Sequence, residues 1–288
     1  MDNLKIKIVG LGEGGARAVG KMISAGVGKD KPVEFIAVGN DENVMLASSA
    51  RKNIFLNRDV TTVYKSVNDA LRGAKLIFLV GGLGGNAARA SIPIITGAAK
   101  NLGAVTVALV CRPFLLENFT RKMNADYTLA NLQGKVDTLI VVPAEKFFHF
   151  RLHQSEVSLA ELFDAADDVF CRGVEVFLHM LTDDENFLIA KWGNAAFGYG
   201  SGKNALEAVK VAAKFPTLEE NDISRTSGIF LRLASGKTLS LKSLDAANNF
   251  LKAQLQPNAK IFSREDIDRT LGEKVFASIV LTRDALRQ

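Results

Sequence analysis

Glycines that follow a short apolar run are the first residues in this sequence whose spacing could do chemistry. Residues 76–80 are large and apolar, as in a buried strand, and four glycines fall within the five positions 81–85. A small-residue pattern then predicts a helix over 86–102. A strand, a glycine loop and a helix start direct backbone N–H groups and the positive helix end at an anion such as a phosphate. A tight turn without a ligand is the alternative.

The N-terminus shows the same arrangement a second time. A strand predicted over 5–9 leads into the glycine-rich segment 10–15, and a helix is predicted over 16–25. The glycine spacing satisfies G-x-G-x-x-G, the dinucleotide fingerprint. A second strand over 33–38 ends just before Asp41, where an acidic residue binds a ribose hydroxyl in nicotinamide enzymes. These residues therefore fit a dehydrogenase as well as another nucleotide-binding protein.

Strands and helices go on alternating through the first half of the chain. Further strands are predicted over 53–56, 104–110 and 136–142, and helices over 60–72 and 117–133. This order predicts an α/β fold with a doubly wound, mostly parallel sheet. Ligands of such sheets bind beyond the carboxyl ends of the strands, so we expect both glycine loops at one edge.

A long helix predicted over 158–181 separates this region from the rest of the chain. Ser158 and Glu161 have the spacing of a capping box at its start. Beyond the helix we expect a smaller α+β domain without a phosphate loop, with a Gly-Ser-Gly turn at 200–202. Its elements are expected as short segments over 187–192 and 195–199, strands over 228–233 and 275–281, and helices over 204–213 and 241–253. The expected domains are 1–155 for nucleotide binding, 156–183 for the connecting helix and 184–288 for the C-terminal domain.

Composition narrows the classes of protein and of site. The 288 residues are 48% hydrophobic, which is ample for a full core, and no apolar run approaches the ~20 residues of a membrane span. The chain enters a strand without a signal-peptide pattern, so a cytoplasmic location is expected. Cys111 and Cys171 predict buried free thiols, and neither they nor the three histidines follow a metal-binding spacing.

The charge is mildly basic, with a net value of +5 and a pI of about 9.1. That balance allows an acidic or membrane-surface partner. Lysines and arginines are scattered along the sequence rather than clustered, so we expect no specific nucleic-acid binding.

Taken together, these motifs resemble FtsZ, the tubulin relative of bacterial and archaeal cell division, over nearly all of 4–284. The resemblance rests on several ordered motifs at matching spacing, which are far more specific than one G-x-G-x-x-G. They are the first glycine loop and helix at 10–22, the second strand at 34–38, the tubulin signature loop at 81–93, the loop and helix at 112–121, the sixth-strand motif at 136–143 and the central helix at 158–169.

The resemblance implies a site for GTP or GDP. It assigns the phosphates to the glycine loops, the ribose region to the next helix, and the base to the central helix. Phe163 would stack on guanine and Asp167 would accept hydrogen bonds from its edge, because a carboxylate can take both N–H donors. Core packing and a solvated helix face are the alternatives for these two side chains. If nucleotide binding is retained, the other candidate binding residues are Gly12, Gly14, Gly15, Arg17, Gly82, Gly84, Gly85, Asn86, Glu117 and Arg121.

Several departures from the family pattern bear on activity. Arg17 stands where the family has an asparagine that touches the base, and Arg89 falls where the signature loop carries threonines. The glycine-rich loop near the γ-phosphate is missing around 56–70. The aspartate loop that positions the attacking water in the family is shortened, which leaves Asp183 and Asp184 as weak catalytic candidates. Ala144 and Glu145 replace the asparagine–aspartate pair after the sixth strand. We do not expect the family's C-terminal adaptor tail.

Three functions are compatible with this sequence. The first is an FtsZ-like cytoskeletal protein that forms or joins filaments, head to tail or through a partner protein, with weakened or lost GTP binding and hydrolysis. The second is an active, polymerisation-dependent GTPase that uses Asp183 or Asp184. The third is an NAD-dependent enzyme that uses the first glycine loop and Asp41.

Overall fold

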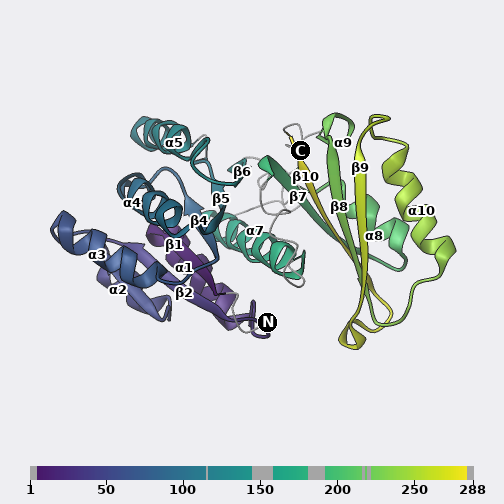
Figure 1. The fold of residues 1–288 in the computed structure, drawn as a ribbon, viewed down its shortest axis with the longest axis horizontal. Coiled ribbons are helices and arrows are strands. Elements are labelled where there is room, and N and C mark those ends of the chain that lie inside the picture. The colour runs from purple at the N-terminus through teal and green to yellow at the C-terminus, as the bar shows by residue number, and fades with distance from the viewer. Residues whose placement is uncertain are drawn as a thin grey trace. The chain divides into compact units, whose positions relative to one another are not determined.

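A computed structural model describes residues 5–114, 116–144, 158–180, 192–215, 218 and 222–283. The chain divides into two compact units on either side of the boundary between Lys191 and Trp192 (Figure 1). Each unit has its own sheet and its own helices. Among the described residues no helix is both long and apolar enough to cross a membrane.

The first unit is built on a parallel sheet with the strand order β3-β2-β1-β4-β5-β6. The central strands are almost wholly buried, which explains why their sequences are continuously apolar rather than alternating. The predicted doubly wound α/β fold is confirmed. The strands are β1 (Ile6–Leu11), β2 (Val33–Gly39), β3 (Lys52–Phe55), β4 (Leu76–Gly82), β5 (Val105–Cys111) and β6 (Thr138–Val142).

Helices cover both faces of this sheet (Figure 1). Helices α3, α4 and α5 share one hydrophobic core with one face, to which β1 contributes Val9 and Leu11. Helices α1 and α7 pack against each other and against the central strands. Helix α2 packs beside α1 through Met45. The helices are α1 (Gly12–Ser24), α2 (Glu42–Ala47), α3 (Val60–Leu71), α4 (Asn86–Leu102), α5 (Phe119–Leu132) and α7 (Leu159–Met180).

Local capping explains where several helices begin. Ser158 and Glu161 form the predicted capping box, with the Ser158 N–H 2.8 Å from the glutamate and the Glu161 N–H 3.3 Å from the serine oxygen. Asp41 accepts from the N–H of Val44 at 3.1 Å and starts α2, which the sequence analysis missed. Helix α1 begins at Gly12, inside the first glycine loop rather than after it.

The second unit is a smaller α+β arrangement, as predicted. Its strand order is β7-β10-β8-β9, with β10 antiparallel to both neighbours and β8 parallel to β9. Helices α8 and α10 pack on this sheet around a shared apolar core. The elements are β7 (Gly193–Gly202), α8 (Ala205–Ala212), α9 (Asp222–Arg225), β8 (Gly228–Ser235), α10 (Leu241–Lys252), β9 (Lys260–Ile267), a 3-10 turn (Arg269–Leu271) and β10 (Val275–Thr282).

The turn predicted at 200–202 is wrong, because β7 continues to Gly202. A Cβ at Gly200 would lie 2.4 Å from the backbone nitrogen of Ala212, and one at Gly202 would lie 2.7 Å from that of Ala208. These glycines therefore let α8 lie directly on the strand. Strand β9 was not predicted, and its charged stretch hides the apolar pattern of a strand.

Candidate functional site

The two glycine loops lie side by side where β1 and β4 end, as predicted. These strands pair in parallel register, with Leu11 opposite Gly81. A Cβ at Gly81 would lie 2.7 Å from the carbonyl oxygen of Leu11, and one at Gly12 would lie 3.3 Å from the Cβ of Ala87. Gly12 has φ +67° and Gly81 has φ +151°, conformations that glycine adopts without strain.

The glycines of the two loops have different local roles. A Cβ at Gly14, Gly82 or Gly85 would meet no atom within 4 Å, so the backbone there borders open space. A Cβ at Gly15 would lie 2.6 Å from backbone atoms of Gly10 and Val80. Gly15, which the resemblance assigns to the phosphates, thus also allows α1 to approach β1 and β4 closely.

A buried asparagine that the sequence analysis missed fixes the second loop. The amide nitrogen of Asn124 donates to the Asn86 side chain at 3.2 Å and to the carbonyl oxygen of Gly84 at 3.4 Å. Its oxygen accepts from Arg89 at 3.3 Å. Arg89 also lies 4.8 Å from the ring centre of Tyr127 on α5. The cation gained in this loop is therefore held against α5.

Glu117 and Arg121 also lie at the second loop. They form an ion pair with each other, and Glu117 accepts from the N–H of Phe114 at 2.8 Å. A Cβ at Gly84 would lie 3.2 Å from the Cβ of Arg121. The structure thus brings these two side chains to the glycine loop, on the same edge of the sheet.

Helices α1 and α7 bring together Arg17, Phe163 and Asp167. The Nε of Arg17 donates to one oxygen of Asp167 at 2.5 Å, and a terminal nitrogen donates to the other at 3.3 Å. Its guanidinium carbon lies 5.0 Å from the centre of the Phe163 ring. The Phe163 and Phe114 rings also pack edge to face, with their centres 6.2 Å apart. Arg17 therefore makes contact with both side chains that the resemblance assigns to guanine.

Burial dominates the electrostatics of Asp167. Its side chain is 1% exposed, whereas that of Arg17 is 44% exposed. Burial raises the pKa of the Asp167 carboxyl above its ordinary value, although Arg17 acts in the opposite direction. One turn further along α1, Lys21 pairs with Asp168 at 2.7 Å and donates to the carbonyl oxygen of Asp164 at 3.1 Å. Two cations of α1 therefore hold α7.

The two ends of the candidate site differ in their contacts. The open glycine backbone and the starts of α1 and α4 suit phosphates. Asp167, the carboxylate that the resemblance assigns to the guanine edge, is paired with Arg17. Asp183 and Asp184 lie outside the described residues. The carboxylate of Asp41, required by the nicotinamide alternative, caps α2.

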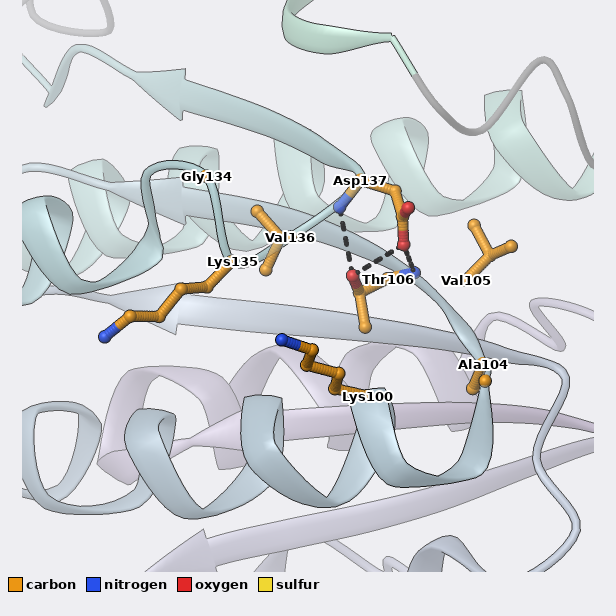
Figure 2. A pocket seen from close by; sticks show the side chains of 9 residues that line it. Lys100, Ala104, Val105, Thr106, Gly134, Lys135, Val136 and Asp137 are labelled. Atoms are coloured by element: carbon orange, nitrogen blue, oxygen red, sulfur yellow. Dashed lines mark hydrogen bonds between the residues drawn. The ribbon is translucent and has the colours of Figure 1, made fainter.

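A separate pocket of about 250 Å³ lies at the opposite edge of the sheet, where β5 and β6 begin (Figure 2). Asp137 in this pocket accepts from the N–H of Thr106 at 2.8 Å and from its hydroxyl at 3.0 Å. These bonds tie the starts of the two strands together. Both bonds go to the same carboxylate oxygen. No group of three or more metal-binding side chains occurs among the described residues.

Two sequence models of known families match the chain, one for each unit. The Tubulin/FtsZ family GTPase domain matches residues 5–151, and the FtsZ family C-terminal domain matches residues 193–283. A curated relative, cell division protein FtsZ 1 of Rhizobium meliloti (strain 1021), is 28% identical over 96% of this chain. The chain spans 51% of the length of that relative.

Solved structures show the same similarity. An FtsZ mutant from M. jannaschii has a TM-score of 0.84 at 25% identity, over 98% of this chain and 91% of its own. An empty FtsZ dimer from M. jannaschii has a TM-score of 0.82 at 26% identity, over 97% and 88%. The fold is also that of CetZ2 from Haloferax volcanii, solved as a GTPγS-bound protofilament, with a TM-score of 0.78 at 18% identity over 97% and 93%.

Proposed function

The chain belongs to the Tubulin/FtsZ family, and we propose that it is a filament-forming or filament-joining member in which GTP binding and hydrolysis are weakened or lost. The cytoskeletal family and the two-unit fold are the premise of this proposal. The nucleotide deficit and the assembly are the proposed parts. We also infer a cytoplasmic location, which is where a filament of this kind would act.

One observation carries the nucleotide part of the proposal, the ion pair between Arg17 and Asp167. A guanine base needs the carboxylate free, and here both oxygens already accept hydrogen bonds from the guanidinium. A charged bidentate pair of this kind is among the stronger polar contacts in proteins. A guanine base must break the Arg17–Asp167 pair before it can bind, and this cost makes the free energy of nucleotide binding less favourable.

The assembly part of the proposal is supported by what the similar proteins are. A dimer of FtsZ from M. jannaschii and a protofilament of CetZ2 have this fold. A head-to-tail contact between two different surfaces gives an open filament when the rotation between subunits does not close a ring. We expect the same kind of contact here, with a copy of this chain or with a partner protein.

Pelleting by ultracentrifugation with electron microscopy of the pellet tests this proposal. We expect filaments whose pelleted amount is the same with GTP, with GDP, without nucleotide, and after chelation of Mg²⁺. A protein that stays monomeric across nucleotide, salt and pH conditions would contradict the assembly part. Filaments that require GTP would contradict the nucleotide part.

An active GTPase is the alternative, favoured by the match to a GTPase domain. In that case Asp183 or Asp184 would act on the nucleotide of a neighbouring subunit. Phosphate release would then rise more than linearly with protein concentration. It would disappear in an Asp183→Ala/Asp184→Ala double variant that still pellets.

A further inference from the structure

The side chain of Arg17 makes the two kinds of contact that a guanine base would make in this pocket. One is edge-on, through two N–H groups that donate to the two oxygens of Asp167, at 2.5 and 3.3 Å. The other is face-on, with the guanidinium carbon 5.0 Å from the ring centre of Phe163. Arginine is suited to both, because its group is planar, carries a fork of donors and stacks on aromatic faces.

Guanine carries the same chemical unit as this side chain. Its N1–H, its C2 atom and its exocyclic amine form an N–C–N group whose N–H bonds point in one direction, as in the fork of arginine. A carboxylate can accept both bonds from either group. The two groups are therefore alternative ligands of Asp167, and both cannot occupy its oxygens together.

We propose that Arg17 is an intramolecular ligand of Phe163 and Asp167. It makes the contacts that a guanine base would make with these two side chains, and it holds α1 against α7. This inference rests on the proposed function, since it names the cause of the weakened guanine binding. It goes further by making the loss reversible, because the Asp167 carboxylate and the Phe163 ring are both present and are held by Arg17 through non-covalent contacts alone.

The burial of the two partners fits an internal ligand that can leave. Asp167 is almost fully enclosed, with 1% of its side chain exposed, so guanine reaches it only after Arg17 moves away. The side chain of Arg17 is 44% exposed, so part of it already lies in solvent. As part of the same chain, it competes at an effective concentration of roughly millimolar or more.

Lys21 provides a matched control, because it joins the same two helices through Asp164 and Asp168 rather than through Asp167 or Phe163. Its ammonium pairs with Asp168 at 2.7 Å, where 54% of the aspartate side chain is exposed. Replacing Lys21 removes one bridge between α1 and α7 and leaves the contacts of Arg17 in place. A general loosening of these helices would therefore affect both variants.

The test is calorimetric titration of the full chain with three ligands: GTP, ITP and inorganic tripolyphosphate. We expect Arg17→Asn to bind GTP about tenfold or more tightly than the unmodified chain. ITP, which lacks the exocyclic amine, is expected to bind both proteins more weakly than GTP but to gain by a similar factor, since its base must also displace Arg17. No gain is expected for tripolyphosphate, which has no base. Lys21→Gln is expected to leave GTP affinity unchanged. Arg17→Lys is expected to give an intermediate gain, because lysine keeps the charge but has no fork.

Two results would contradict the proposal that Arg17 is an internal ligand. One is a folded Arg17→Asn chain that binds GTP no better than the unmodified chain, and the other is an equal gain for GTP and tripolyphosphate. Circular dichroism checks the fold, and if Arg17→Asn does not fold, the same comparison is made with Arg17→Lys. The GTP affinity of the unmodified chain tests the proposed function. The ratio of the GTP affinity of Arg17→Asn to that of the unmodified chain tests this inference. The two can therefore fail separately.

Discussion

The carboxylate of Asp167 is almost entirely buried, and its contribution to the stability of the fold therefore depends on pH. Burial raises its pKa in the folded protein above the ordinary value, and Arg17 offsets only part of that effect. An acid with a raised folded pKa binds its proton more tightly when folded. Its contribution to stability is therefore complete below the ordinary pKa of 3.8 and is lost as the pH rises through the raised value.

An Asp167→Asn variant tests this directly, because the amide cannot ionise. We expect the unfolding free energy of the unmodified chain, minus that of the variant, to be largest near pH 4. The difference should fall as the pH rises and become constant once the carboxyl has ionised. Urea unfolding of both proteins between pH 4 and pH 7 measures it. A difference that grows toward pH 7 would contradict the dominance of burial.

Single residues show how far the sequence predicts this site. The family pattern marks Arg17, Phe163 and Asp167 separately. In the structure Arg17 contacts both Phe163 and Asp167. Arg17 and Asp167 are 150 positions apart, and no local sequence pattern predicts a contact over that distance. Asn124 was missed because a buried polar residue in a helix has no distinctive spacing, although its burial beside Ala125 and Thr128 follows the helical repeat.

Strands β1 and β2 are joined by a partly buried ion pair between Lys7 and Glu34, with 2.8 Å between their charged atoms. The hydrogen bond from Lys7 is the largest cause of the lowered pKa of Glu34. An acid with a lowered folded pKa stabilises the fold above its ordinary pKa, here 4.5, and loses that contribution as the pH falls through the lowered value.

We therefore expect Glu34→Gln to destabilise the chain by about 1–3 kcal/mol at pH 7, because Lys7 is left buried without its charged partner. The difference should shrink as the pH falls below about 4. Urea unfolding at several pH values measures it. Glu273→Gln is the control, since its carboxylate is 96% exposed and 3.8 Å from Lys237, and it should change stability by less than ~0.5 kcal/mol. Equal effects of the two changes would contradict this account.

The close packing of α8 on β7 requires a glycine at position 200. A Cβ there would lie 2.6 Å from the carbonyl oxygen of Ala208, and backbone atoms cannot move aside as a side chain can. We expect Gly200→Ala to destabilise the second unit by about 1–3 kcal/mol in urea unfolding. Gly97→Ala in α4 is the matched control, because its Cβ meets no atom within 4 Å, and it should stabilise by about 0.5–1 kcal/mol. A neutral Gly200→Ala would contradict the close approach.

At the level of elements, the sequence predicts best where one physical signal dominates. Helix α4 has its predicted bounds, and the apolar strands β4 and β5 were found because both of their faces are buried. The turn predicted at 200–202 was wrong because glycine occurs both in turns and where a helix packs closely on a strand, as α8 does here. Strand β9 was missed because its charges are paired within the sheet, where Asp266 accepts from Arg232 at 2.5 Å and Arg264 at 2.7 Å.

For the whole molecule, the alternation of strands and helices and the ordered motifs led to the correct fold and family. Two matched domains and FtsZ structures of similar fold confirm both. Filament formation and the state of the nucleotide site are not encoded in the fold and stay proposals. The division of the chain at 155 and 183 also stays a prediction.

The central claim is that this family member binds guanine nucleotide weakly or not at all, and its nucleotide content tests that claim most directly. The purified chain is denatured, any released nucleotide is identified by chromatography, and the emptied protein is titrated with labelled GTP and GDP. We expect far less than one nucleotide per chain and dissociation constants of roughly 0.1 mM or weaker. One tightly held GTP or GDP per chain would contradict the claim and show that Arg17 yields to the base.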